Sequence, residues 1–193
     1  AAFWAMLPER RVDFLIALHL NQLGLGLIDP ATELFCRVSF LAALWSLLVV
    51  LALLLDRRTG RVVALGVLLA LALHFLVDEG LLKHALLTLF PMRVRPYLAH
   101  PGEITPIGQL FTDSSFPSSH AGSTAAIMTV FGSAYRRWWA AAAGVCAAMC
   151  FARLHNGMHY PTDVLTGSLL GLGYGLLAVR LAPKISARLA AGR

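Results

Sequence analysis

Charged residues are scarce in this chain. Only 13% of its 193 residues are Asp, Glu, Lys or Arg, whereas 58% are hydrophobic, and the mean hydropathy is +0.71. Soluble domains carry about 25% charged residues, so this composition excludes a soluble globular protein and predicts a polytopic membrane protein. Because about five or six helical spans fill a chain of this length, we expect residues 1–193 to form a single membrane-embedded domain.

Cysteine is scarce too, and Cys36, Cys146 and Cys150 all lie inside apolar runs. An odd number in such surroundings excludes a disulfide framework and indicates small hydrophobic residues. The net charge of +6 is spread between apolar blocks without interleaved aromatic residues, which excludes nucleic acid as a partner. The lipid bilayer is the expected partner.

Five continuous apolar stretches predict an all-α bundle of transmembrane helices, because backbone polar groups in lipid must be satisfied within each segment. They cover residues 34–55, 62–82, 119–135, 138–154 and 162–182. Residues 1–30 are amphipathic and are interrupted by polar residues such as Asp13 and Asn21. We therefore expect an N-terminal helix that lies in the membrane interface, with a sixth span as the alternative.

The basic residues outside these stretches predict the orientation. They fall into three clusters: Arg57, Arg58 and Arg61; Arg136 and Arg137; and Arg180, Lys184, Arg188 and Arg193. By the positive-inside rule these clusters are cytoplasmic, so we expect a multi-pass protein of the cytoplasmic (inner) membrane with a cytoplasmic C-terminus. The loops at about 91–118 and 155–161 then face the periplasm or the cell exterior.

The outer segments nevertheless hold many cations and histidines. Ionisable residues at the membrane edge are costly and are usually functional, so their excess over the local carboxylates indicates an anionic ligand. Structural salt bridges at the loop edges are the alternative interpretation. The cations and histidines are Lys83, Arg93, Arg95, His100, His120, Arg153, His155 and His159, and Asp163 is one of the carboxylates among them.

The motif "PSSH" ends at His120, where the third span begins. Ser118 or Ser119 is a natural N-cap whose hydroxyl would satisfy helix amides. The same amides and hydroxyl also form an anion site suited to phosphate. A cap does not need His120, so we favour phosphate binding here.

The segment "ARLHNGMHYPTD" forms a second cluster. On a single helix, His155, His159 and Asp163 would stack at a spacing compatible with a metal site. Gly157 and Pro161 argue against such a helix. A turn would instead let Asp163 accept a hydrogen bond from His159 and leave the other ring nitrogen as a nucleophile, with Arg153 placed to bind an anion.

A third cluster, "MRVRPY", presents Arg93 and Arg95, whose guanidinium groups suit phosphate. Two other features are interpreted as packing: His74 lies within an apolar run, and Gly167, Gly171 and Gly175 repeat at the spacing that lets helices approach closely.

Together the three motifs resemble the type 2 phosphatidic acid phosphatase superfamily of membrane lipid phosphatases. That family carries Lys, six residues, Arg-Pro; then Pro-Ser-Gly-His; then Ser-Arg, five residues, His, three residues, Asp. Here "RP" starting at Arg95, "PSSH" ending at His120, and "AR" followed by His159 and Asp163 at the family spacing occur in the same order. The resemblance covers about residues 80–180.

The chain departs from that pattern at three places. Ser119 replaces Gly and Ala152 replaces Ser, both small-for-small changes. Lys83 is separated from Arg95 by eleven residues instead of six, and Thr88 occupies the expected lysine position. Either Lys83 reaches the phosphate by snorkelling, which we favour, or Arg93 takes its place.

The resemblance implies a hydrolase that needs neither metal nor cofactor. His159 would attack phosphorus to form a phosphohistidine, Asp163 would orient it, and His120 would act as general acid and then as general base. The implied phosphate-binding residues are Arg95, Arg153, Ser118, Ser119, and Lys83 or Arg93.

We therefore expect an integral-membrane phosphatase that hydrolyses a lipid phosphate or diphosphate at the outer membrane face. By family analogy undecaprenyl diphosphate is the first candidate substrate, and phosphatidylglycerophosphate, phosphatidic acid and lipid A are alternatives. Two alternatives come from other classes: a metal-dependent membrane hydrolase that uses His120, His155, His159 and Asp163, and an anion transporter. A transporter would be expected to place charges near mid-bilayer on broken helices, which the sequence does not indicate.

Overall fold

A computed structural model describes residues 9–24, 26–86 and 92–191, and the side chains of all of these except residues 9, 10, 79 and 83–86. Within this part of the chain the fold is all helix apart from an isolated bridge between Pro101 and Ile104, which confirms the expected fold class. The elements are α2 (Glu9–Gln22), α3 (Asp29–Cys36), α4 (Val38–Leu55), α5 (Arg57–His74), the π-helix η1 (Phe75–Leu86), α6 (Pro96–Ala99), α7 (Ser119–Ala134), the short 3₁₀ helix η3 (Arg136–Trp138), α8 (Trp139–His155) and α9 (Pro161–Ala191).

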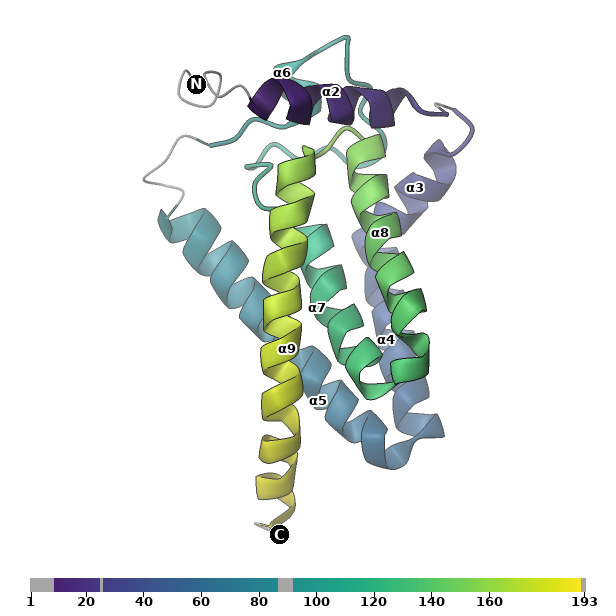
Figure 1. Cartoon of the computed structure of the whole chain (residues 1–193), viewed down its shortest axis with the longest axis vertical. Coiled ribbons are helices and arrows are strands. Elements are labelled where there is room, and N and C mark those ends of the chain that lie inside the picture. Colours follow the sequence, from purple (N-terminus) through teal and green to yellow (C-terminus); the bar gives the residue numbers. More distant parts are fainter. Residues whose placement is uncertain (1–8, 25, 87–91, 192–193) are drawn as a thin grey trace.

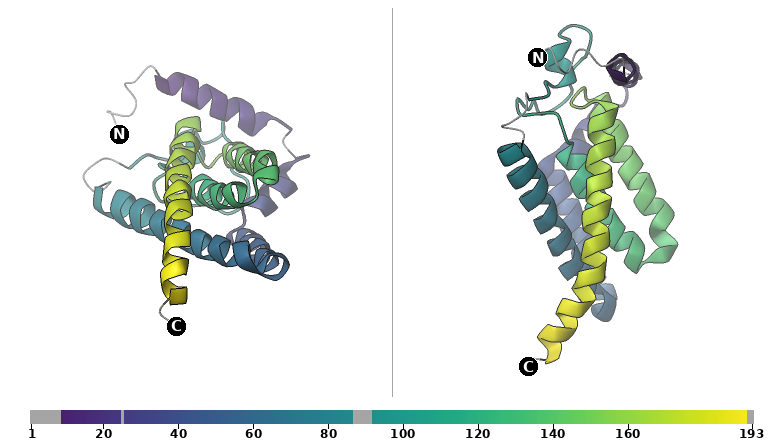
Figure 2. Two further views of the ribbon diagram at one scale, coloured as in Figure 1. Left: turned by 60° about the horizontal axis from the view of Figure 1, so that its bottom comes forward. Right: turned by 60° about the vertical axis from the view of Figure 1, so that its left-hand side comes forward.

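Helix α7 occupies the middle of the bundle, enclosed by α5, α8 and α9 (Figures 1 and 2). It crosses α9 so closely that glycine is required at the contact. A Cβ atom on Gly171 would lie 2.0 Å from the carbonyl oxygen of Gly122, and one on Gly167 would lie 2.4 Å from that of Ser118. The glycine repeat therefore holds the N-terminal part of α7 directly against α9, as the spacing predicted.

Three of the described helices are long and apolar enough to cross a membrane: α4, the combined α5–η1 stretch Arg57–Leu82, and α9. Helices α7 and α8 form where the third and fourth spans were predicted. With 16 and 17 residues they are shorter than the three helices just named. The expected total of five spans stays a prediction.

The first predicted span, 34–55, is interrupted in the structure. Helix α3 ends at Cys36, and Arg37 adopts an extended conformation with φ −70° and ψ 125° before α4 begins. The break depends on the tertiary contacts of the segment and not on its hydropathy, so the apolar pattern of the sequence could not show it. The break leaves the carbonyl of Cys36 at a helix end, where it has no partner within the helix.

Helix α2 lies across the end of the bundle, roughly perpendicular to α8 and α9 (Figure 1). Its polar residues Asp13 and Asn21 are buried against the bundle, whereas Val12, Leu15 and Ile16 are exposed. With 14 residues it is not among the helices long enough to span. This arrangement supports the expected interfacial helix.

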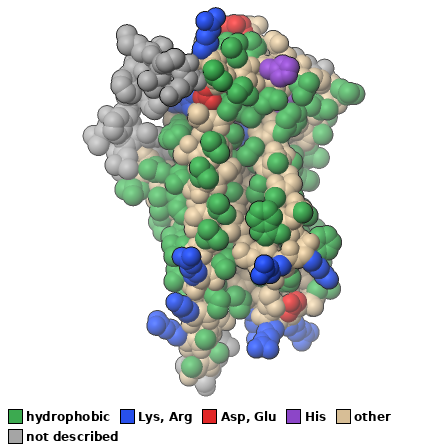
Figure 3. All heavy atoms as spheres, viewed as in Figure 1, with side chains coloured by type: hydrophobic (Ala, Val, Ile, Leu, Met, Phe, Trp, Pro, Cys, Tyr) green, Lys and Arg blue, Asp and Glu red, His purple; other side chains and the backbone are tan. Residues whose placement is uncertain are grey.

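The three basic clusters share one end of the molecule. The start of α5, the η3 turn and the C-terminal part of α9 lie at the end opposite α2 and α6 (Figure 1), and most of the Lys and Arg side chains visible in Figure 3 gather there. One end of the bundle is therefore basic, as the loop charges predicted. Its assignment to the cytoplasm stays a prediction.

Candidate active site

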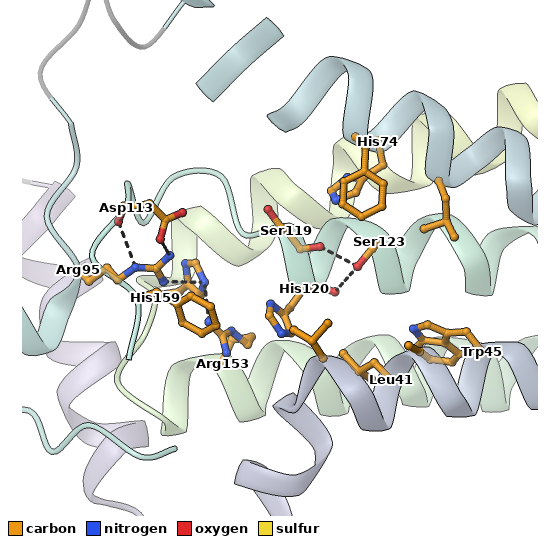
Figure 4. A pocket seen from close by; sticks show the side chains of 15 residues that line it. Leu41, Trp45, His74, Arg95, Asp113, Ser119, His120, Ser123, Arg153 and His159 are labelled. Atoms are coloured by element: carbon orange, nitrogen blue, oxygen red, sulfur yellow. Dashed lines mark hydrogen bonds and ion pairs between the residues drawn. The ribbon is translucent and has the colours of Figure 1, made fainter. Parts of the chain in front are cut away.

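A cavity of about 440 Å³ opens between α4, α5 and α7 and extends to the turn between α8 and α9 (Figure 4). Its lining divides into two regions. The polar region comprises Arg95, Asp113, Ser119, His120, Ser123, Arg153 and His159, with Phe111 beside them, and the other region is mainly apolar and comprises Val38, Leu41, Ala42, Trp45, Leu71, His74 and Phe75. Such a cavity suits an amphiphile with a polar head and a hydrocarbon tail.

His159 lies in the turn that the sequence predicted between α8 and α9, and its side chain is almost fully buried. Its Nδ1 lies 2.7 Å from the carbonyl oxygen of Ser115. Since a carbonyl only accepts, Nδ1 must carry the hydrogen, and Nε2 of the neutral ring then bears the lone pair. The lone pair of a potential nucleophile is thereby directed into the polar region of the cavity.

Two guanidinium groups converge on that lone pair. Nε2 of His159 lies 3.2 Å from a terminal nitrogen of Arg153 and 3.4 Å from one of Arg95. Both arginines are buried, with 2% and 3% of their surface exposed. Among the described residues Arg153 forms no ion pair with a carboxylate, and its Nε has no hydrogen-bond partner. A buried guanidinium of this kind is costly unless an anion binds to it.

Arg95 is anchored on several sides. It donates to the carbonyls of Met158 and Asp113 and forms an ion pair at 2.7 Å with the Asp113 carboxylate, which is 52% exposed. The aromatic ring of Phe111 faces the guanidinium carbons of both Arg95 and Arg153, at 5.4 and 5.8 Å. These contacts hold the guanidinium N–H donors in position in the absence of a ligand.

The same surroundings keep His159 neutral. Burial lowers the pKa of His159 well below its ordinary value of 6.5, and the positive charges of Arg153 and Arg95 and the nearby His120 lower it further, although the hydrogen bond to Ser115 opposes them. Burial and like charge both disfavour the imidazolium form. An imidazole must be unprotonated to act as a nucleophile, and the neutral His159 meets this requirement. The two guanidinium groups beside it would bind an anionic substrate.

His120 enters the cavity from the first turn of α7 (Figure 4). Its Nε2 lies 3.0 Å from the carbonyl oxygen of Cys36, the carbonyl exposed by the break between α3 and α4. That contact orients the ring and assigns the Nε2 hydrogen. His120 and His159 therefore line one cavity, and they come from separate elements of the chain.

The two serines of "PSSH" occupy different positions. Ser119 lines the cavity, and its carbonyl accepts a hydrogen bond from Ser123 one turn along α7. Ser118 is the N-cap residue, but its side chain makes no capping hydrogen bond, contrary to the capping interpretation. Its hydroxyl is buried without a partner among the described residues, and its backbone N–H donates to the carbonyl of Asp163. The structure thus places Ser119, but not the side chain of Ser118, in the cavity lining.

Asp163 was expected to accept a hydrogen bond from His159, and the structure corrects this. The carboxylate is 3.7 Å from Nδ1 of His159, whereas the carbonyl of Ser115 is at 2.7 Å. Asp163 instead accepts hydrogen bonds from the backbone of Tyr160 and from Arg93. It therefore acts on His159 through the turn that it holds and through its charge.

Arg93 does not line the cavity. Its guanidinium pairs with Asp163 and with Asp13 of α2, and it lies 4.2 Å from the centre of the Tyr160 ring. Two carboxylates already satisfy it, so the geometry does not favour phosphate binding by Arg93. The sequence could not separate Arg93 from Arg95, because the contacts with Asp13 and Asp163 are long-range.

The first-motif lysine falls at the edge of the described part of the chain. The side chain of Lys83, in η1, and all of Thr88 lie outside the described residues. The phosphate-binding role of Lys83 stays a prediction.

Four residues near the site were not predicted: Phe111, Asp113, Ser115 and Ser123. Ser115 immediately precedes the "FPSSH" segment and Ser123 follows Ser119 by one helical turn, so proximity to the motif was the only signal. Asp113 and Phe111 act through contacts with arginines distant in sequence, for which no local pattern exists.

His155 makes structural contacts and does not line the cavity. Its Nε2 lies 2.9 Å from the carboxylate of Asp29 and its Nδ1 lies 3.0 Å from the carbonyl of Leu20. No group of three or more His, Cys, Asp or Glu within the described ranges is arranged to hold a metal ion. The geometry therefore gives no support to the metal-dependent alternative.

Comparison with known proteins places these residues in a family context. A model of the PAP2 superfamily matches residues 61–187, more than half of the chain. No curated protein matches.

Two solved structures share the fold. The crystal structure of Aquifex aeolicus LpxE is 20% identical, covering 85% of this chain and 92% of the other, with a TM-score of 0.65. The crystal structure of the first transmembrane PAP2 type phosphatidylglycerolphosphate phosphatase from Bacillus subtilis is also 20% identical, covering 95% and 91%, with a TM-score of 0.66.

Proposed function

Because the chain belongs to the PAP2 superfamily and is a membrane lipid phosphatase, we propose that it releases the terminal phosphate of a lipid phosphate or diphosphate through a phosphohistidine at His159. The observation that carries this proposal is the convergence of Arg95 and Arg153 on Nε2 of His159 within one cavity. Phosphoryl transfer depends mainly on positioning and charge stabilisation, and this arrangement provides both.

In the first half-reaction, the lone pair on Nε2 of His159 attacks phosphorus, and the bond between phosphorus and the leaving oxygen breaks. Arg95 and Arg153 bind the phosphoryl oxygens, as forked donors do. His120 donates a proton to the leaving oxygen. With Nε2 of His120 bound to the Cys36 carbonyl, Nδ1 is the nitrogen that exchanges this proton.

In the second half-reaction, water attacks the phosphohistidine on the face vacated by the leaving lipid. His120, now deprotonated, accepts a proton from that water as its oxygen bonds to phosphorus. The bond between phosphorus and Nε2 then breaks, which returns the electron pair to His159 and releases inorganic phosphate. The positive charge that His159 carries in the intermediate is favoured by the bound phosphoryl oxygens and by the nearby Asp163.

The apolar lining supports a lipid as the leaving group. Leu41 and Trp45 of α4 continue the cavity away from the arginines (Figure 4), and Leu71 of α5 also lines it. Undecaprenyl diphosphate is our first candidate substrate. Phosphatidylglycerophosphate, for which the Bacillus subtilis neighbour is named, phosphatidic acid and lipid A are the alternatives. The site lies at the end opposite the basic clusters, which supports a location at the outer face of the cytoplasmic membrane.

The decisive experiment is to trap the covalent intermediate. The purified protein is mixed with a lipid phosphate carrying radioactive phosphorus and quenched in alkali, under which phosphohistidine survives. We expect label on the wild-type protein but not on His159→Ala, whose phosphate release falls by about 10⁴-fold or more. Labelling of His159→Ala, or phosphate release at the wild-type rate, would refute the assignment.

Two controls complete this experiment. His100→Ala removes a histidine outside the cavity and is expected to label normally. A chelator is expected to leave phosphate release unchanged, whereas vanadate, which mimics the transferring phosphoryl group, is expected to inhibit it. Loss of activity with the chelator alone would point to a metal-dependent hydrolase.

A further inference from the structure

A buried polar cluster lies beside the cavity, outside the three sequence motifs. His74 ends α5, Asp78 lies one turn later in η1, and Tyr174 faces them from α9. Nδ1 of His74 is 2.9 Å from a carboxylate oxygen of Asp78, and the Tyr174 hydroxyl donates to the other oxygen at 2.5 Å. His74 and Asp78 have no exposed surface. A cluster so costly to bury indicates a function.

The position of His74 places it within reach of a bound lipid. Its ring lines the cavity near Ser119 and Ser123 of α7 (Figure 4). A Cβ atom on Gly122 would lie 2.9 Å from the His74 ring, so the ring is held against the α7 backbone. In the view of Figure 4, His74 lies on the side of His120 away from Arg95 and His159. A ligand whose terminal phosphate meets the arginines would extend past His74.

The His74 ring keeps hydrogen-bonding capacity that the cluster does not use. Nδ1 faces the Asp78 carboxylate, but both ring nitrogens are buried and neither makes a hydrogen bond of accepted geometry among the described residues. An imidazole ring carries at least one N–H in each of its charge states. The cluster therefore holds an unused donor at the cavity wall.

The type of helix changes at His74, which is a second indication that this cluster has a function. The α-helix gives way to a π-helix immediately after His74. Such segments are rare and occur frequently at functional sites. Asp78 and Tyr174 pin the ring at this transition.

We propose that His74 is a specificity-determining residue that donates a hydrogen bond from Nε2 to a substrate oxygen on the lipid side of the scissile phosphate. This inference rests on the proposed function. The acceptor is either the inner phosphate of a lipid diphosphate or an ester oxygen of a glycerophospholipid. Both present an oxygen a few bonds from the scissile phosphorus, whereas an isoprenyl or alkyl monophosphate does not. Asp78 and Tyr174 are positioning residues for His74.

The test compares three substrates in detergent: farnesyl diphosphate, a short-chain phosphatidic acid, and farnesyl monophosphate, which has the same tail as the first and no inner acceptor. We expect His74→Leu to lower kcat/KM for one or both oxygen-bearing substrates by about 10- to 100-fold, as loss of a hydrogen bond to a charged or polar group does. Farnesyl monophosphate is expected to change by less than about threefold. A loss of kcat/KM with the diphosphate alone identifies the inner phosphate as the hydrogen-bond acceptor. A loss with phosphatidic acid alone identifies the ester oxygen.

Two further variants separate recognition from folding. His74→Gln retains an amide donor and is expected to recover part of the lost selectivity. His19→Leu makes the same substitution at an exposed histidine of α2 and is expected to leave all three rates unchanged. An equal loss on all three substrates, or no loss on any, would overturn the role of His74. Failure of the wild type to release phosphate from any of them would instead count against the proposed function.

Discussion

At the scale of single residues, the chemistry of His159 is decided by its contacts. A carbonyl, two guanidinium groups and burial together select one tautomer and one charge state. The motif spacing indicated this histidine as a site residue, and the structure places it in the cavity lining. It assigned the orienting group to Asp163, but the ring contacts the carbonyl of Ser115. A backbone carbonyl has no sequence signature, so no pattern could have revealed this partner.

The depressed pKa of His159 predicts a pH dependence of stability. Its folded-state pKa lies well below the ordinary value of 6.5, so below about pH 6.5 the unfolded chain binds a proton that the folded chain does not. The contribution of His159 to stability is therefore complete above about pH 6.5 and declines as the pH falls toward the folded-state pKa. We expect thermal unfolding in detergent to show a smaller acid-induced loss of stability for His159→Gln than for wild type. Parallel pH profiles for the two proteins would contradict the neutral imidazole.

At the scale of elements, Arg93 joins α2 to the start of α9. It pairs with Asp13 of α2 and with Asp163, and Asp13 also accepts hydrogen bonds from Thr162. The sequence predicted an amphipathic helix, but it did not predict that this helix is tied to the turn carrying His159. That connection depends on residues about 70 to 150 positions apart.

Removal of one partner tests the importance of this junction. Asp13→Ala leaves the mostly buried Arg93 with one carboxylate fewer, which is expected to cost about 3 kcal/mol of unfolding free energy. Arg37→Ala is the matched control, because it breaks the exposed ion pair with Glu33, for which the expected cost is about 0–1 kcal/mol. Denaturant unfolding in detergent measures both. Equal costs would show that the Arg93 junction contributes no more than a surface pair.

The crossing of α7 and α9 yields a second prediction at this scale. Gly171→Ala places a methyl group against the Gly122 backbone, so we expect a loss of about 1–3 kcal/mol and a reduced rate of phosphate release as the first turn of α7 is displaced. Gly173→Ala, two positions along the same helix, meets open space and is expected to gain about 0.5–1 kcal/mol. Thermal unfolding and phosphate release of the two variants test this. A Gly171→Ala protein as active and stable as Gly173→Ala would contradict the close crossing.

At the scale of the whole molecule, the separation of the basic end from the site predicts a topology. Glu103 is exposed in the loop at the α2 end, and Arg188 is exposed near the end of α9. In intact cells a membrane-impermeant maleimide is expected to label Glu103→Cys and not Arg188→Cys, which should react only after the membrane is opened. The parent protein supplies the background labelling of the native cysteines. The opposite pattern would place the site on the cytoplasmic side.

Four features could be predicted from the amino-acid sequence: the helical membrane class, the turn before α9, the glycine contact with α7 and the three motifs. Each of these follows from local composition or helical period, which are properties of neighbouring residues. Three other features became visible only in the folded chain: α3 and α4 are separate helices, Arg95 and not Arg93 lines the cavity, and His74 belongs to the cavity lining. These outcomes depend on which distant groups satisfy a buried charge or carbonyl, and no local period encodes that choice.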